Sequence, residues 1–370
     1  MRVYLLTLLV SAATTFLLTG LVRRLGVAIG AMTEVRDRDV HNTPTPRLGG
    51  PAMLAGLATG LLAASQFPLI EQVFSTSRDA QALLTGGLVI CLVGVADDIW
   101  GLDALTKFAG QVLAAGVMVV QGVQLIWLPW FGGTLSLNSA QGTLLTVLVV
   151  AVTINAVNFV DGLDGLAAGV VAIGAAAFFT YSYLLAVEHG LQRATTPALI
   201  TAILVGICIG FLPHNFAPAR VFMGDSGAML LGLLFAASSI TLTGQADPGA
   251  VQVGAFAALL PLILPVAVLA VPIIDLLLAV VRRTWAGRSP FHPDKLHLHH
   301  RLLDIGHSQK RAVLVMYGWS AIIAFGVVTV SLVDDWAVRV AAAAALVAIT
   351  AVTVALPRLE RRRRPTGATT

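Results

Sequence analysis

Long apolar stretches, separated by short polar segments, follow one another along almost the whole chain. Eleven of these stretches are long enough to cross a hydrocarbon layer of roughly 30 Å as an α-helix, which rises about 1.5 Å per residue. They lie at residues 3–22, 48–66, 80–96, 105–121, 141–157, 165–187, 196–213, 226–244, 251–281, 312–332 and 336–356. The stretch at 251–281 is longer than one span requires and contains Pro261, Pro265 and Pro272, so we expect a tilted or broken helix there. The pattern predicts an all-α, polytopic membrane protein of about eleven transmembrane helices.

The composition agrees with lipid as the surrounding solvent. Apolar residues make up 57% of the 370 residues and charged residues 11%, whereas a soluble domain carries roughly 25% charged residues. We therefore expect one integral membrane domain over residues 1–370, with a basic and disordered cytoplasmic tail at 358–370. The chain has two cysteines, Cys91 and Cys208, and both lie inside apolar stretches. This number is too small for a disulfide framework or a zinc-binding cysteine cluster.

Lysine and arginine are distributed unevenly between the loops, and this orients the predicted spans. If the N-terminus lies outside, 19 of the 23 Lys and Arg residues fall in cytoplasmic segments. Cytoplasmic loops carry an excess of these residues because translocating a cation is costly and the inner leaflet is anionic. We therefore predict an outside N-terminus and a cytoplasmic C-terminus. Residues 121–141 then lie outside, where Trp127, Trp130 and the Gly132–Gly133 pair are compatible with a short hairpin.

With this orientation, the dense polar segments all lie on the cytoplasmic side, at residues 36–50, 97–98, 155–165, 213–227 and 282–311. Acidic groups at membrane depth usually face a cavity or a partner because burying them in lipid is costly. Segments that are distant in sequence but share one face indicate a single composite site.

Asp97 and Asp98 end one apolar stretch just before another begins. Neighbouring residues of a helix point about 100° apart. We therefore expect the two carboxylates to serve different tasks, one facing a metal or other cation and the other a substrate proton. The alternative is a pair of solvated acids at a helix end, but two carboxylates in that place oppose the helix dipole.

Four polar side chains recur at every third residue between two apolar stretches: Asn155, Asn158, Asp161 and Asp164. Glycines among them permit a break in the helix, and amides with acids beside glycine backbone suit a sugar or nucleoside. The alternative is helix capping, because Asp161 and Asp164 are both suited to cap the span that follows. Asp225, in a glycine-flanked bend, is similarly open to two interpretations: it caps a helix, or it binds a divalent cation that bridges phosphate oxygens.

Three histidines and an arginine lie among leucines near the end of the segment 282–311: His297, His299, His300 and Arg301. The pattern is typical of a short helix lying at the membrane interface. Histidine clusters also bind zinc. The chain has no HExxH motif, however, and carboxylates with nearby arginines favour phosphate and Mg²⁺.

Together these motifs resemble those of the polyprenyl-phosphate N-acetylhexosamine-1-phosphate transferases, the family that contains the peptidoglycan lipid I synthase and the GlcNAc-1-phosphate transferases that initiate enterobacterial-antigen or teichoic-acid synthesis. The matching segments are Arg38 to Gly50, Asp97-Asp98 with Gly101, Leu102 and Lys107, Asn155 to Leu166, His214 to Asp225, and Pro293 to Leu303. They cover the cytoplasmic loops almost from end to end, in the family's order. The forms His-x-His-His-Arg-Leu at 297–302 and Pro-Thr-Pro-Arg at 44–47 are similar to the GlcNAc branch, whereas Asp39 stands where many relatives carry Lys.

The resemblance implies a reaction, a cofactor and a location. The reaction is transfer of GlcNAc-1-phosphate from UDP-GlcNAc to a polyprenyl phosphate, undecaprenyl or decaprenyl, with release of UMP, as the first membrane step of a cell-envelope glycan. The implied cofactor is Mg²⁺, for which Mn²⁺ substitutes. The implied location is the bacterial cytoplasmic membrane, with the active site on the cytoplasmic face. A homodimer is expected by analogy, and no nucleic-acid partner is expected.

Residue roles are carried over from the matching motifs. The resemblance implies Asp225 as the metal ligand and Asp97, Asp98 and His299 as catalytic residues, with Asp98 taking the proton from the lipid phosphate. Phosphates would be held by Lys107, His297, His299, His300 and Arg301. The uracil pocket would consist of Gly162, Leu163, Asp164 and Phe222, with Asn158, Asp161 and Asn215 around it. Further candidates are His41, Arg47 and Asn155.

Two other functions fit parts of the pattern. A lipid I synthase would use UDP-MurNAc-pentapeptide as its donor, and a proton-coupled transporter or lipid flippase would use the acids as a cation path. A transporter predicts polar residues near the bilayer midplane, but only Asp275 lies well inside an apolar stretch. The sequence also contains no internal repeat, a common feature of transporters.

Overall fold

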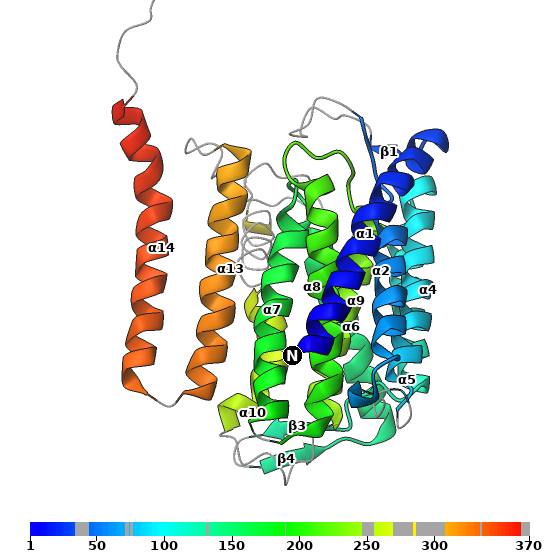
Figure 1. The fold of residues 1–370 in the computed structure, drawn as a ribbon, viewed down its shortest axis with the longest axis vertical. Coiled ribbons are helices and arrows are strands. Elements are labelled where there is room, and N and C mark those ends of the chain that lie inside the picture. Colours follow the sequence, from blue (N-terminus) through cyan, green and yellow to red (C-terminus); the bar gives the residue numbers. More distant parts are fainter. Residues whose placement is uncertain are drawn as a thin grey trace, which may run out of the picture.

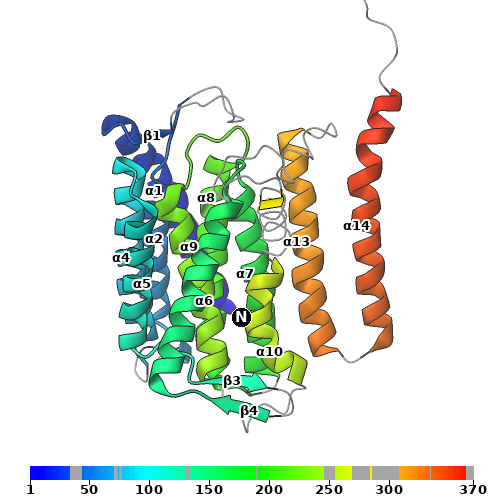
Figure 2. The same cartoon turned by 180° about the vertical axis from the view of Figure 1, so that it is seen from behind.

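The fold is known from a computed structural model, which describes residues 1–33, 44–70, 74, 77–130, 133–188, 190–245, 255–268, 284–285, 308–333 and 335–363. Within these ranges, long helices run side by side and form a single bundle (Figures 1 and 2). Helices dominate because a chain in lipid must satisfy its backbone N–H and C=O groups internally. The α-helices are α1 (Arg2–Ala28), α2 (Gly49–Ala64), α4 (Asp79–Trp100), α5 (Ala104–Val120), α6 (Ser139–Val160), α7 (Leu166–Val187), α8 (Thr195–Asn215), α9 (Gly224–Gln245), α10 (Ala255–Val268), α13 (Gln309–Leu332) and α14 (Trp336–Arg363).

Each of the eleven predicted apolar stretches coincides with one of these helices, at least in part. Eight described helices are long and apolar enough to cross a membrane, while α2 and α5 are shorter apolar helices. The prediction of a polytopic helical membrane protein is therefore confirmed. The exact number of crossings and their orientation stay predictions. Of the expected tilted or broken helix at 251–281, the described part is α10, which contains Pro261 and Pro265 and continues through both; Pro272 and Asp275 lie outside the described residues.

Local signals in the sequence account for several helix ends. Asp103 begins α5, because its side chain accepts hydrogen bonds from the backbone N–H groups of Leu105 and Thr106. A capping box of Asn138 and Gln141 begins α6. Helix α4 ends at Gly101, which adopts a left-handed φ of 68°. The α4–α5 connection, which follows the predicted acid pair, is therefore a tight, well-defined turn.

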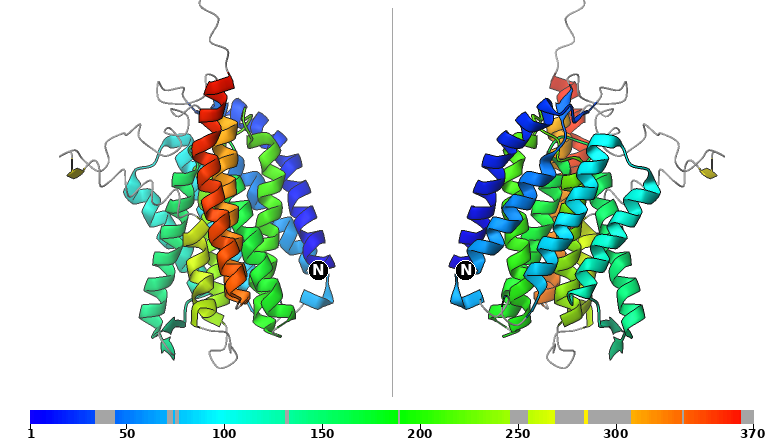
Figure 3. Two further views of the ribbon diagram at one scale, coloured as in Figure 1. Left: turned by 90° about the vertical axis from the view of Figure 1, so that its left-hand side faces the viewer. Right: turned by 90° about the vertical axis from the view of Figure 1, so that its right-hand side faces the viewer.

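Close packing of the bundle depends on glycine. A methyl group at Gly206 or Gly210 of α8 would overlap the backbone of α1, and one at Gly56 or Gly60 of α2 would overlap side chains of α1. Small residues at such positions allow membrane helices to approach closely, which replaces the hydrophobic driving force that lipid removes. The helix α9 lies in the middle of the bundle, where it packs against α2, α4, α6, α8 and α10. At the edge, α14 packs against α13 (Figure 3).

Two short antiparallel ribbons lie at opposite ends of the bundle (Figure 1). Strands β3 (Trp127–Trp130) and β4 (Gly133–Ser136) pair with Trp130 opposite Gly133, which confirms the hairpin predicted within 121–141. At the other end, β1 (Met32–Thr33) pairs with β2 (Thr45–Pro46). Residues in and just after β2 also bond to Phe222, which lies two residues before α9. The Phe222 N–H donates to the Pro46 carbonyl over 2.8 Å, and the Gly49 N–H donates to the Phe222 carbonyl over 3.2 Å. The beginning of α9 is thus tied to the first loop.

Candidate active site

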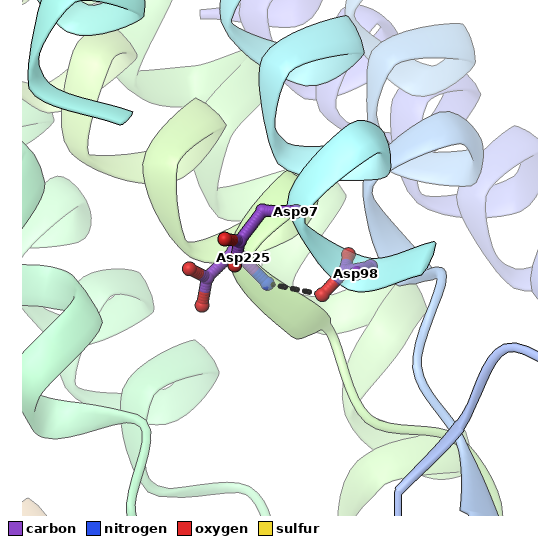
Figure 4. A group of neighbouring side chains, drawn as sticks. All are labelled: Asp97, Asp98 and Asp225. Atoms are coloured by element: carbon purple, nitrogen blue, oxygen red, sulfur yellow. Dashed lines mark hydrogen bonds between the residues drawn. The ribbon is translucent and has the colours of Figure 1, made fainter. Parts of the chain in front are cut away.

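Three carboxylates meet at the end of the bundle that carries β1 and β2. Asp97 and Asp98 come from the last turn of α4, and Asp225 from the first turn of α9. Figure 4 shows the three side chains converging from these two helices. One carboxylate oxygen of each lies within 4.8 Å of the others. The prediction that segments remote in sequence form one acidic site is confirmed for these residues.

Asp98 is 3% exposed, and the beginning of α9 supplies its hydrogen bonds. Its carboxylate accepts from the Asp225 N–H at 2.9 Å, from the Ser226 N–H at 3.2 Å and from the Ser226 hydroxyl at 2.8 Å. The first N–H groups of a helix have no partner within the helix, and a carboxylate there also meets the positive end of the helix dipole. Asp98 therefore caps α9 from a neighbouring helix.

Two glycines make this contact possible. Gly224 has a φ of 66°, and a Cβ atom in its place would overlap the Asp98 carboxylate. A Cβ atom at Gly94, one turn before Asp98 on α4, would overlap the Ser226 backbone. The two helix ends are consequently in direct backbone contact, which fixes the position of Asp225 relative to α4.

Asp97 points in a different direction from Asp98, as the helix geometry predicted. One of its oxygens accepts from the Leu102 N–H at 2.9 Å, and the other lies 2.8 Å from the ammonium of Lys107 on α5. Lys107 also forms an ion pair with Asp225. One cation therefore bridges Asp97 and Asp225, while Asp98 is bonded to backbone and hydroxyl groups.

The composition of the cluster fits a divalent cation. With all groups ionised, three carboxylates and one ammonium leave a formal charge of −2. Carboxylate oxygens are the ligands that Mg²⁺ prefers. Asp225 and Asp97 are the better candidates for ligands, because their side chains are 24% and 13% exposed and the oxygens of Asp98 already accept three hydrogen bonds.

Helix α6 contributes two amides, one to the acidic cluster and one a turn deeper in the bundle. Asn158 donates to Asp225 over 2.9 Å. Asn155 donates instead to the Gln111 side-chain oxygen over 2.8 Å, and Gln111 lies one turn after Lys107 on α5. Gln111 is not among the residues predicted from the sequence; the signal for it is its spacing of four residues from Lys107 inside an apolar stretch.

The turn between α6 and α7 contains three of the four residues expected to form the uracil pocket, Gly162, Leu163 and Asp164. Leu163 and Asp164 are buried, and Gly162 is exposed. The Ala219 N–H donates to Asp164 over 3.0 Å, so the turn is joined to the segment before α9. Burial and three nearby carboxylates, led by that of Asp225, raise the pKa of Asp161 to about 8. The turn therefore carries a carboxyl group that favours a nearby cation or its own protonated form.

Asn215 makes a second link between the turn and the segment that leads to α9. Its side-chain oxygen accepts from the Gly165 N–H at 3.0 Å, and its side-chain nitrogen donates to the Val221 carbonyl at 3.0 Å. The alternative interpretation of Asp161 and Asp164 as caps of the next span is wrong. Helix α7 begins after Gly165, whose left-handed φ of 79° forms the turn, and no side chain caps it.

Some predicted residues are not placed. His41, His297, His299, His300 and Arg301 lie outside the described residues, so their roles stay predictions. Arg47 is described, and its backbone forms a bridge with Phe222. Both residues therefore lie next to the start of α9, as the composite site requires.

A helical bundle with a cluster of buried and half-buried carboxylates at one end defines a polytopic membrane protein with a cation-attracting centre. Comparison with known proteins specifies the class. The model of glycosyl transferase family 4 matches residues 80–243. The chain is 48% identical to the decaprenyl-phosphate N-acetylglucosaminephosphotransferase of Mycolicibacterium smegmatis. The aligned part covers 97% of this chain and 89% of that relative.

Two other relatives are less similar. A probable undecaprenyl-phosphate N-acetylglucosaminyl 1-phosphate transferase of Bacillus subtilis is 30% identical over 84% of this chain and 80% of its own length. A phospho-N-acetylmuramoyl-pentapeptide-transferase of Desulforudis audaxviator is 30% identical over 84% of this chain and 93% of its own. The chain belongs to glycosyl transferase family 4.

Proposed function

We propose that the protein transfers GlcNAc-1-phosphate from UDP-GlcNAc to decaprenyl phosphate, with release of UMP. The observation that carries this proposal is the bridge from Asp97 through Lys107 to Asp225, next to the turn at 161–165. The greater identity to a decaprenyl-phosphate N-acetylglucosaminephosphotransferase than to a muramoyl-pentapeptide transferase supports both the donor and the lipid. The excess of Lys and Arg in the predicted inner loops supports a cytoplasmic site. A homodimer stays a prediction.

Phosphoryl transfer requires positioning and neutralisation of charge more than covalent chemistry. We assign Asp225 and Asn158 to the donor side of the site, since Asn158 holds the Asp225 carboxylate in place. Asp225 would hold Mg²⁺, which supplies charge neutralisation at the diphosphate when bound. Lys107, which is paired with both Asp97 and Asp225, would offset the negative charge of the phosphates. The turn at 161–165 would hold the uracil.

We propose that Asp97, and not Asp98, accepts the proton of the lipid phosphate. A general base needs an oxygen that the substrate can reach. Asp98 is 3% exposed and its oxygens accept three hydrogen bonds from α9. Asp97 is more accessible and has one oxygen facing the Lys107 ammonium, where a phosphate would bind. Asp98 is then a positioning residue.

Exposed apolar side chains beside the site support a lipid substrate. Trp100 and Leu105, which flank the α4–α5 turn, are 75% and 77% exposed. Aromatic and aliphatic side chains at a helix end favour the membrane interface. A phosphate carried by a membrane lipid would therefore reach Asp97 and Lys107 from the bilayer surface, without leaving it.

The test is product identity with the purified protein. Decaprenyl phosphate is offered with UDP-GlcNAc or with UDP-MurNAc-pentapeptide, UMP release is measured, and the lipid product is identified by mass. We expect decaprenyl-diphosphate-GlcNAc only, with loss of activity in EDTA and recovery with Mg²⁺ or Mn²⁺. Asp225→Asn should lower turnover by about 10²-fold or more. The matched control is Asp103→Asn, which keeps the cap of α5 on the same turn and should retain activity.

Three results would reject this function. Formation of the muramoyl-pentapeptide lipid would identify a lipid I synthase. Lipid or cation movement in proteoliposomes without UMP would favour a transporter. Full turnover of folded Asp225→Asn would remove the acidic cluster from the reaction.

A further inference from the structure

Tyr317 connects the C-terminal part of the chain to the turn at 161–165. It lies on α13, and its hydroxyl donates to the Gly165 carbonyl over 2.5 Å. The two residues are 152 positions apart in sequence. Tyr317 also lies beyond residues 80–243, the part of the chain that the family model matches. The contact therefore joins the matched part of the chain to a helix outside it.

The Tyr317 ring fits closely onto α7. A Cβ atom at Gly169 would overlap the ring and its hydroxyl group, so only glycine leaves room for the ring at this position. The Gly165 residue is one turn earlier and has the left-handed φ of 79° that forms the turn. The space left by Gly169 and the hydrogen bond of the Tyr317 hydroxyl together hold the tyrosine against the first turn of α7.

Gly165 is fixed at both polar groups of its backbone. Its N–H donates to Asn215 at the end of α8, and its carbonyl accepts from Tyr317 of α13 as well as from the Gly169 N–H at 3.0 Å. A backbone carbonyl has two lone pairs, so the helix bond and the tyrosine bond are compatible. Removing the tyrosine bond would leave the helix intact but would release one of the two bonds that join Gly165 to other helices.

We propose that Tyr317 is a positioning residue for the nucleotide part of the donor. It holds Gly165, and through it Gly162, Leu163 and Asp164, in the arrangement that receives the uracil. The proposal rests on the proposed function, in which this turn binds the nucleotide. Tyr317 acts on the turn, whereas α9 holds Asp98 and Lys107 of α5 holds Asp97. Its effect should therefore fall on donor binding and spare both lipid binding and the chemical step.

The test compares Tyr317→Phe with Tyr183→Phe. The first removes the hydroxyl and keeps the ring on Gly169. The second makes the same change on α7 itself, at a half-buried tyrosine near the other end of the helix, where its ring packs on Phe179. The KM of UDP-GlcNAc, the KM of decaprenyl phosphate, kcat, the Kd of UMP in the absence of lipid and the melting temperature are measured for each variant and for the wild type.

We expect Tyr317→Phe to raise the KM of UDP-GlcNAc and the Kd of UMP by roughly three- to tenfold, the range for loss of one hydrogen bond. The lipid KM, kcat and melting temperature should stay within about twofold or 2 °C of the wild type, and Tyr183→Phe should change none of these quantities. Unchanged UMP affinity in Tyr317→Phe would overturn the inference. An equal rise in both KM values with a lower melting temperature would also overturn it, as a purely structural role. If the wild type neither binds UMP nor releases it, the proposed function itself fails, which is a separate result.

Discussion

Helices α9 and α14 have nearly the same mean hydropathy, 1.6 and 1.8 over their span residues, but opposite surroundings. In α9 an apolar window of 18 residues is buried completely inside the protein, and in the corresponding window of α14 no residue is buried. In Figure 1, α14 stands at the outer edge beside α13, whereas α9 lies among the other helices. Apolar composition therefore identifies a membrane helix but does not distinguish a helix packed in protein from one that faces lipid.

The two helices differ in how they contact their neighbours. Helix α9 contacts α6 at Gly232, where a Cβ atom would lie 2.6 Å from the Ile154 Cα. At its beginning, the Asp225 N–H of α9 donates to the Asp98 carboxylate of α4. Helix α14 contacts α13 through side chains such as Thr353, which accepts from the Trp319 indole at 3.2 Å. Backbone contact makes α9 intolerant of change, and this rigidity holds Asp225 in place. Side-chain contact at the edge imposes no such restriction on α14.

The largest effect is expected from breaking the start of α9. Asp98→Ala removes the acceptor for two N–H groups and one hydroxyl in a buried place. We expect the free energy of unfolding to fall by about 3 kcal/mol, and turnover to fall at least about 10²-fold because Asp225 is displaced. Unfolding in mixed micelles and UMP release measure the two quantities.

Asp97→Ala is the control for that variant. It should lose turnover as well, but it should cost less than about 1 kcal/mol of stability, since Asp97 is more exposed and Lys107 keeps Asp225 as a partner. Equal stability losses in the two variants would contradict the division between a capping Asp98 and a reacting Asp97.

A smaller effect is expected one turn deeper, at the amide pair beside α9. Gln111→Leu removes the acceptor of Asn155, whose amide still donates to the Ala151 carbonyl. We expect a loss of about 1 kcal/mol in the free energy of unfolding, in line with hydrogen bonds between membrane helices. A double-mutant cycle with Asn155→Leu should give a coupling energy of about 0.6 kcal/mol or more. Strict additivity of the two changes would show that the pair does not hold α5 and α6 together.

Much of the fold could be predicted from local properties of the sequence. Each of the eleven apolar stretches matches a described helix, and the tryptophans and glycines within 121–141 correctly predicted the β3–β4 hairpin. The convergence of Asp97, Asp98 and Asp225 could be predicted because charge distribution placed their segments on one side. These inferences need only spacing and charge, which the chain displays without its partners.

The remaining features depend on contacts between distant segments. The cap that Asp98 provides for α9 and the bond from Tyr317 to Gly165 join residues more than a hundred positions apart, and no local pattern indicates them. The alternative interpretation of Asp161 and Asp164 as helix caps was wrong for a related reason. Each residue type suits a cap, but a left-handed Gly165 starts α7 instead and leaves Asp164 to bond with the Ala219 N–H.

The smallest effect is expected at the edge of the bundle, and it tests the difference between α9 and α14 directly. The same substitution is made in both helices, as Ala236→Leu in α9 and Ala343→Leu in α14; Ala236 is fully buried and Ala343 is exposed. Overpacking a filled interior should cost α9 roughly 1–3 kcal/mol in the free energy of unfolding. In α14 the added carbons enter lipid, so the change should stay within about 0.5 kcal/mol and turnover should be unaffected. A comparable loss in Ala343→Leu would mean that another surface covers α14 in the membrane, and crosslinking from residue 343 would then identify that surface.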